Sequence, residues 1–155
     1  MKLLVTKDSQ RIARWLRLMG HDAMLMPASP LPALYRLAYN ERRTIITRDG
    51  RVRPGALVRV VHLESGELDA QIRQLWLALP ALDEPEAAFS RCDRCNAPVE
   101  PVEKAAVQSL VPPYVFQTQP TFHRCPSCQR IYWAATHWQR VRRFLGRLRK
   151  EAHHA

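Results

Sequence analysis

Four cysteines fall into two pairs with the same spacing in the C-terminal half of the chain. They form Cys92-x-x-Cys95 and Cys125-x-x-Cys128, and together they use every cysteine of the 155-residue sequence. A CxxC pair brings two thiolates of one tight turn to the same cation, and two such pairs complete a tetrahedron. The pattern therefore predicts a structural zinc site without an open coordination position. Two disulfides, or four unrelated thiols, are the alternatives.

A second candidate site consists of two carboxylates that follow predicted strands. Asp8 follows a strand predicted over 2–6, and Asp49 follows a strand predicted over 44–47. The carboxyl ends of parallel strands share one sheet edge, where two carboxylates could hold Mg²⁺ or Mn²⁺ and activate water against a phosphodiester. Asp8 could instead only cap the following helix, and Asp49 could only serve the turn Arg48-Asp49-Gly50.

The sequence is strongly basic, and the excess is concentrated toward its C-terminus. The formal net charge is +10, with 13 Lys/Arg against 10 Asp/Glu in residues 1–88 and 11 against 4 in residues 89–155. A basic surface attracts polyanions, so nucleic acid is the expected partner, with RNA ahead of DNA. A charge that serves only solubility is the alternative. The candidate RNA-binding side chains are Arg11, Arg14, Arg17, Arg48, His137, Arg140 and Arg143.

Hydrophobic periodicity indicates alternating strands and helices in the first half of the chain. Strands are predicted over 2–6, 22–26, 44–47 and 59–63, with helices over 9–19, from 34 to about 43, and over 68–79. In the first helix, Arg11, Arg14 and Arg17 lie opposite the apolar stripe. This order predicts an α/β fold with a mostly parallel sheet flanked by helices on both faces.

The rest of the chain is predicted to form a smaller unit. We expect an α/β domain at 1–82, an acidic, proline-containing linker at 83–88, and a zinc ribbon with a basic C-terminal helix at 89–150. Residues 111–115 are predicted to be extended, 131–133 to form a strand, and the chain from His137 to be helical. The absence of a signal peptide and of a membrane-length apolar run predicts a cytoplasmic protein with reduced thiols.

Several motifs together resemble those of the Mut-seven-C RNase domain family. The motifs are Ile12-Ala13-Arg14-Trp15-Leu16-Arg17 with Gly20 and Asp22, Thr47-Arg48-Asp49, Cys92-x-x-Cys95-Asn96, Val111-Pro112-Pro113-Tyr114, Cys125-Pro126-x-Cys128, Tyr132-Trp133 and Thr136-His137-Trp138. The resemblance implies a PIN-like nuclease fold joined to a zinc ribbon, and cleavage of RNA by acidic residues with a divalent cation. It carries Asp49 over as a metal ligand, and it favours a role for His137.

The sequence departs from the family pattern near the implied metal site. Thr6 stands where the family usually has Asp, Pro30-Leu31-Pro32-Ala33 replaces usual acids, and Gln10 replaces a usual glycine. The favoured hypothesis is an RNA-binding protein with metal-dependent endoribonuclease activity, in which Asp49 and Asp8 serve as ligands. The alternative is a degenerate PIN-like domain that only binds RNA, a ribosome or a protein. A toxin or regulatory partner for an acidic protein is a third hypothesis.

Overall fold

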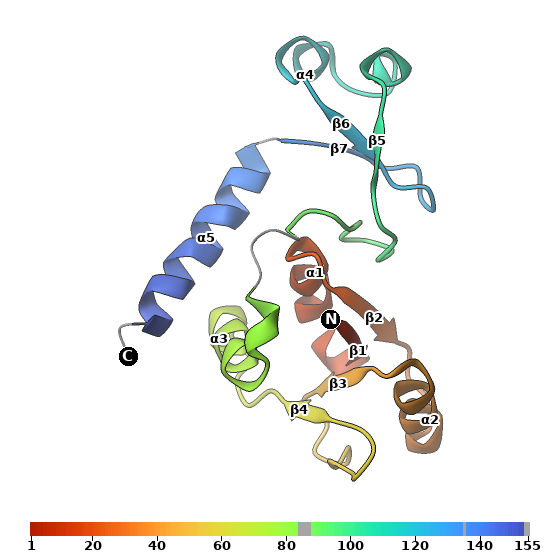
Figure 1. Cartoon of the computed structure of the whole chain (residues 1–155), viewed down its shortest axis with the longest axis vertical. Helices are drawn as coiled ribbons and strands as arrows, with labels where there is room; N and C mark the ends of the chain where they lie inside the picture. The colour runs from red at the N-terminus through yellow and green to blue at the C-terminus, as the bar shows by residue number, and fades with distance from the viewer. Residues whose placement is uncertain (84–87, 135, 154–155) are drawn as a thin grey trace. The chain divides into compact units, whose positions relative to one another are not determined.

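The computed structural model describes residues 1–83, 88–134 and 136–153 (Figure 1). The chain divides into two compact units, Met1–Asn96 and Ala97–Ala155. The first cysteine pair therefore belongs to the first unit, and the second pair belongs to the second unit. Most of the linker predicted at 83–88 lies outside the described residues.

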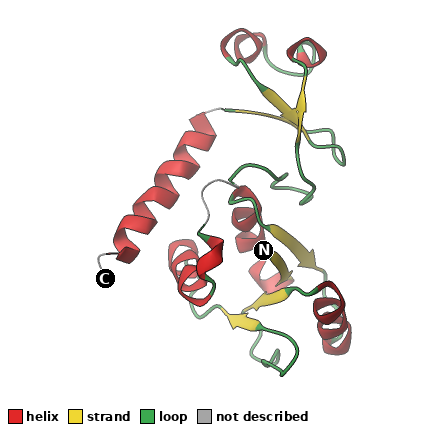
Figure 2. Ribbon diagram, viewed as in Figure 1, coloured by secondary structure: helices red, strands yellow, loops and turns green. Residues whose placement is uncertain are grey.

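The first unit is built on a parallel sheet of four strands, as the sequence predicts (Figure 2). The strands are β1 (Lys2–Thr6), β2 (Asp22–Met26), β3 (Thr44–Thr47) and β4 (Val60–His62). Their order is β2-β1-β3-β4, and every neighbouring pair is parallel. The register aligns Thr6 with Met26 and Val5 with Ile46, so β1, β2 and β3 end at the same sheet edge.

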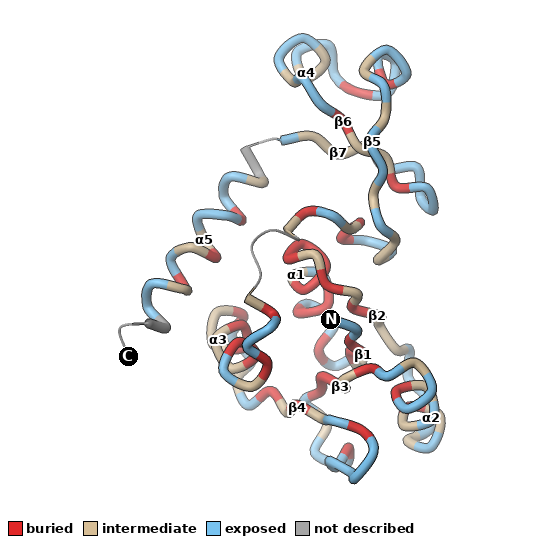
Figure 3. The backbone as a smooth tube through the Cα atoms, in the orientation of Figure 1, coloured by how far each residue is buried: buried red, intermediate tan, exposed pale blue. Residues whose placement is uncertain are grey.

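Helices cover both faces of this sheet because its side chains are apolar on both sides. The helices are α1 (Gln10–Leu18), α2 (Leu31–Glu41) and α3 (Leu68–Ala78), with 3-10 turns at Lys7–Ser9 and Pro80–Leu82. Leu4 and Ile45 pack with Leu34 and Ala38 of α2. On the alternate positions Leu3, Val5 and Ile46 are fully buried, and α1 and α3 contact one another. Figure 3 shows buried residues along β1 and β3, the two middle strands of the sheet.

The start of α1 differs from the sequence prediction, whereas its end agrees with it. Asp8 does not cap the helix: Ser9 occupies the N-cap position, and no side-chain cap hydrogen bond is made there. The capping prediction is therefore wrong, and the Asp8 carboxylate is used elsewhere, as described below. The helix ends at Leu18, and Gly20 follows its C-cap residue with a φ of 91°, which lets the His21 N–H reach the Leu16 carbonyl at 2.9 Å.

The second unit contains an antiparallel sheet of three strands. These are β5 (Glu100–Val102), β6 (Phe122–Arg124) and β7 (Ile131–Trp133), in the order β5-β6-β7. A small core forms around Val107, Val111 and Phe122, and the Phe122 and Trp133 rings lie 6.4 Å apart between centroids. The predicted strand at 131–133 is confirmed. The predicted fold class, a parallel α/β sheet with helices followed by a small cysteine-bearing unit and a closing helix, is also confirmed.

Two further elements complete the second unit. The prediction of an extended segment at 111–115 is wrong, because α4 (Pro113–Thr118) begins inside it. Pro113 stands in the first turn of this helix, where a missing N–H costs nothing. The last helix, α5 (Thr136–His153), buries Val141, Leu145 and Leu148, with 0–3% of each residue exposed. Their spacing places them on one face of the helix.

Candidate functional site

The four cysteines meet at one point. Their sulfur atoms all lie within 4.8 Å of one another. Cys92 and Cys125 are buried, Cys95 and Cys128 are exposed, and none of the four forms a disulfide. The alternatives of disulfides and of unrelated thiols are therefore both excluded.

The two cysteine turns have the same local geometry, and we call each turn a knuckle. In the first, the Cys95 N–H donates to the Cys92 sulfur at 3.4 Å, and in the second the Cys128 N–H donates to the Cys125 sulfur at 3.5 Å. The residue after each pair has a left-handed backbone, with φ of 71° at Asn96 and 62° at Gln129. Because the turn is the same in both knuckles, the two thiols of each pair have the same relative orientation.

This ligand set fits a structural zinc ion. Four sulfurs at zinc–sulfur distances of about 2.3 Å stand roughly 3.8 Å apart in a tetrahedron. The observed cluster, with every sulfur within 4.8 Å of the others, needs only a small contraction to reach that geometry. The four cysteines are thus positioned to bind one metal ion. A shell of four thiolates leaves no coordination position for a substrate, so the ion would hold structure only.

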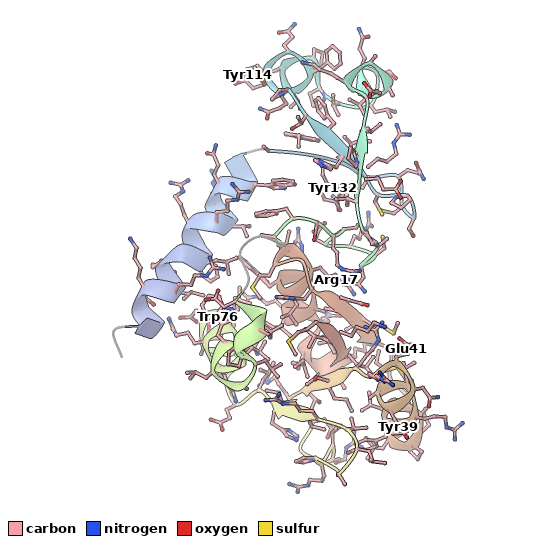
Figure 4. All side chains as sticks on the ribbon, in the orientation of Figure 1. Arg17, Tyr39, Glu41, Trp76, Tyr114 and Tyr132 are labelled. Carbon is pink, nitrogen blue, oxygen red and sulfur yellow. The ribbon has the colours of Figure 1, made fainter. Side chains whose placement is uncertain are left out.

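Arg17 anchors the first knuckle to the α/β sheet, and its position differs from the sequence prediction. The prediction placed Arg17 on the outer face of its helix, whereas only 8% of the residue is exposed. Its guanidinium donates to the Ala23 carbonyl at 2.8 Å and to the carbonyls of Asp93 and Arg94 at 3.2 and 2.8 Å. Burial lowers the pKa of Arg17, against the opposing effect of the nearby Cys92 and Cys95. Figure 4 labels this side chain beside α1.

Two more side chains join the first knuckle to the sheet. Asn96 accepts the Ala23 N–H at 3.0 Å and donates to Asp22 at 2.7 Å, and Arg14 pairs with Asp93 at 2.7 Å. Partial burial raises the pKa of Asp22, but hydrogen bonds from Arg43 and Asn96 outweigh it, so the pKa is lowered overall. The first knuckle is therefore attached at the amino end of β2.

The predicted carboxylates lie at the opposite edge of the sheet, where β1 and β3 end. One oxygen of Asp8 accepts the Thr6 hydroxyl, and the other accepts the Arg48 N–H at 2.7 Å. The Thr6 hydroxyl lies 2.8 Å from that of Thr47, which accepts the Asp49 N–H at 3.0 Å. Asp8 thus ties the end of β1 to the turn after β3.

The Asp49 carboxylate forms an ion pair with Arg51. The Arg51 guanidinium donates to both carboxylate oxygens at 2.7–3.1 Å, and the Arg51 N–H donates to one of them at 2.9 Å. These hydrogen bonds lower the pKa of Asp49 to about 2. The prediction missed Arg51, although an arginine two residues after an acid in a turn was a readable signal.

A cavity of about 630 Å³ opens at this edge and brings both acids together with basic side chains. Its charged lining residues are Lys7, Asp8, Arg48, Asp49 and Arg51. The sequence correctly placed Asp8 and Asp49 at one edge. It did not identify Lys7 as a neighbour.

Asp8 and Asp49 are a weak ligand pair for a Mg²⁺ or Mn²⁺ ion. All four of their carboxylate oxygens accept hydrogen bonds, and the Arg51 guanidinium neutralises Asp49, so a cation at Asp49 must displace Arg51. Among the described residues, the four cysteines are the only group of three or more metal-ligating side chains. Glu64 and Glu67, which follow β4, do not line the cavity.

The predicted RNA-binding side chains have different surroundings. Arg11, Arg48, Arg140 and Arg143 are exposed, Arg14 is exposed but paired with Asp93, and Arg17 is buried. The side chain of His137 lies outside the described residues. Arg140 and Arg143 line a hollow of about 350 Å³ on α5 together with Phe144 and Arg147, which the sequence analysis did not select. The Arg147 guanidinium lies 5.4 Å from the centre of the Phe144 ring.

Comparison with known proteins identifies one match. The family model described as Mut7-C RNAse domain matches residues 1–145. The resemblance predicted from the motifs is therefore confirmed, and it covers both units. Neither the curated proteins nor the solved structures contain a significant match. In the part of the chain that the structure describes, none of the helices has the length and apolarity needed to cross a membrane.

Proposed function

The chain belongs to the Mut7-C RNAse domain family, and from that premise we propose that this protein binds RNA. The observation that carries the proposal is the family match over residues 1–145, in a chain whose formal charge is +10. A positive surface of this kind gains affinity for RNA by releasing the counterions that surround the phosphates.

The outer face of α5 supports this proposal. Arg140, Arg143 and Arg147 follow one another at helical spacing, so their guanidinium groups face the same side. Phe144 lies among them and offers a ring on which an unstacked base can lie. We assign this face, called the α5 arginine face, to the backbone of single-stranded RNA.

Salt dependence tests RNA binding. A fluorescent single-stranded oligoribonucleotide should bind with an affinity that falls steeply between 50 and 200 mM salt, because each neutralised phosphate contributes about −0.7 to the logarithmic slope. The double variant Arg140→Ala/Arg143→Ala should flatten that slope by about 1.4. Its matched control is Arg36→Ala/Arg53→Ala, which removes the same charge from exposed positions of the first unit. An absence of RNA binding at the lowest salt concentration contradicts the proposal.

Metal-dependent hydrolysis of RNA is the second candidate function. The observation that favours it is that Asp8 and Asp49 line the same cavity. Mn²⁺-dependent cleavage of a labelled RNA, lost in Asp49→Asn, would support the enzyme. Because the carboxylate oxygens are already engaged, we propose instead that the domain is a degenerate PIN-like fold that binds RNA without cutting it. Unchanged RNA after incubation with Mn²⁺ is the expected result.

Partners and location complete the proposal. The basic surface could meet RNA alone or within a ribosome, and a salt-sensitive complex with naked RNA separates the first case from a protein partner. Cysteines that form no disulfide persist where thiols stay reduced, so we propose a cytoplasmic location.

A further inference from the structure

The cavity at the carboxyl ends of β1 and β3 has one cationic wall. Lys7, Arg48 and Arg51 supply three positive charges to its lining, against the two carboxylates of Asp8 and Asp49. Arg51 is committed to Asp49, whereas Asp8 receives a backbone N–H and a hydroxyl. The Lys7 and Arg48 side chains have no hydrogen-bond or ion-pair partner in the part of the chain described. The positive charge of the cavity is therefore available to an anion.

The rest of the lining of this cavity is mostly apolar, and we call its apolar part the apolar wall. It is formed by the segment that follows β2 and by the start of α2, with one residue from the turn after β3. The apolar lining residues are Met26, Pro27, Ala28, Pro30, Leu31, Leu34 and Val52. Leu34 and Val52 belong to the buried core, so this wall is held rigidly. The volume of about 630 Å³ is in the range of small-molecule sites.

We propose that this cavity binds one nucleoside monophosphate unit of RNA, without a divalent cation. The phosphate lies against Lys7 and Arg48, and the nucleoside lies along the apolar wall. An anion with an apolar body matches the two walls, whereas inorganic phosphate uses only the first. The inference rests on the proposed RNA binding, and it gives the carboxylates a structural role. Asp8 holds the turn after β3 in place, and Asp49 orients Arg51.

Neutral residues make up the rest of the lining next to the two acids. Thr6 supplies a neutral hydroxyl that satisfies Asp8, and Pro30 and Leu31 supply apolar surface. None of them adds negative charge to the two carboxylates, so the three cationic side chains leave the lining with a net positive charge that favours an anion over a cation.

The experiment is a titration of the full chain with AMP, followed by calorimetry or by amide chemical shifts. The buffer contains no added divalent cation and no chelator, so that the zinc content can be verified and kept constant. AMP should bind at least tenfold more tightly than either adenosine or inorganic phosphate. Addition of Mg²⁺ or Mn²⁺ at constant ionic strength should change the AMP affinity by less than twofold. Binding that appears only after either cation is added overturns the inference.

Variants localise the binding. Arg48→Ala and Lys7→Ala should each lower the AMP affinity about tenfold, because one charged phosphate contact is lost. Arg53→Ala is the matched control, since Arg53 is exposed near this turn but does not line the cavity. Leu31→Ala should weaken AMP and leave inorganic phosphate unchanged. All four positions are exposed or half-buried, so the variants are expected to fold, and thermal unfolding verifies this. Equal AMP affinities in Arg48→Ala, Lys7→Ala and the unaltered protein overturn the inference.

AMP binding and oligoribonucleotide binding together distinguish a failure of this inference from a failure of the RNA-binding proposal. If the oligoribonucleotide binds and AMP does not, this inference is wrong and the proposed function stands. If neither ligand binds, both are wrong. If AMP binds without RNA binding, the cavity serves a free nucleotide and the RNA proposal is wrong.

Discussion

The first cysteine knuckle and the carboxylate pair lie at opposite edges of the same parallel sheet. The knuckle is attached at the amino end of β2 through Asn96, and Asp8 and Asp49 follow the carboxyl ends of β1 and β3. Both groups were read from the sequence as metal ligands. The sulfurs of the four cysteines converge on one point, whereas the oxygens of the two carboxylates are held by hydrogen bonds to other residues.

The difference comes from how far apart in the chain each set of partners lies. Within a knuckle, the sulfur, the N–H that contacts it and the left-handed residue fall within five residues, so spacing alone determines the geometry. Asp8 meets Arg48, forty residues away, and Asp49 meets Arg51 across a turn. A carboxylate at a sheet edge that is already paired with a guanidinium binds a metal cation only by giving up that pair, because the two positive groups compete for the same charge.

Loss of one sulfur should have the largest effect. Cys125→Ser removes one of four thiolates, and because structural zinc contributes roughly 10–16 kcal/mol of apparent binding free energy, we expect zinc to be lost and the second unit to unfold. Elemental analysis of the purified protein and far-UV circular dichroism measure the two effects.

The control for Cys125→Ser is a variant at the other edge of the sheet. Asp49→Asn alters that edge and should retain zinc in full. If Cys125→Ser also retains zinc at the level of the unaltered protein, the four-sulfur site is wrong.

Arg17 gives the second largest effect, since it connects the first knuckle to the sheet. Arg17→Met keeps the length of the side chain but leaves the carbonyls of Ala23, Asp93 and Arg94 without their donor. Orphaned buried acceptors cost about 1–3 kcal/mol each, so a loss of about 3 kcal/mol in the free energy of unfolding is expected in a denaturant titration. Arg11→Met, at an exposed position of the same helix, should change it by less than about 0.5 kcal/mol.

The sequence was sufficient for most of the first unit. β1, β2 and β3 were predicted with their observed bounds, because short apolar runs between polar turns have few alternatives. Arg17 was misplaced because helical periodicity shows which side of a helix is polar but not what later segment will cover it. The first knuckle, more than seventy residues away, buries that arginine.

The sequence predicted the sulfur cluster more completely than it predicted the carboxylate site. Spacing was enough for the sulfur cluster. For the carboxylate edge, topology correctly brought Asp8 and Asp49 to one cavity, but it could not show that Thr6, Arg48 and Arg51 would take their oxygens. Those contacts depend on side-chain directions at strand ends, which periodicity does not determine.

Adding a carboxylate at the carboxyl ends of β1 and β3 should let this edge of the sheet bind a metal ion, as the cysteine site is expected to do. Thr6→Asp places a third acid beside Asp8, and like charges at this distance are relieved by a divalent cation. We expect the affinity for Mn²⁺ to rise about tenfold relative to the unaltered protein, measured by calorimetry. Thr6→Asn has the same shape without the charge and should show no gain. Equal Mn²⁺ binding by the two variants would mean that charge at this edge does not control cation binding.

The smallest effect concerns the proton affinity of Asp49. Its pKa is lowered to about 2 from 3.8 by the hydrogen bonds of Arg51, so the carboxylate contributes stability above about pH 4 that is lost as the pH falls toward 2. In Arg51→Ala the pKa should return toward 3.8, and the stability should depend less on pH between 4 and 2. Carbon-13 NMR of the Asp49 carboxyl group measures the pKa, with Arg53→Ala as the control. The variant also frees one oxygen and leaves only the backbone N–H of residue 51 on the other, so weak Mn²⁺ binding should appear together with the raised pKa. A pKa that stays near 2 in Arg51→Ala would mean that Arg51 is not what occupies this carboxylate.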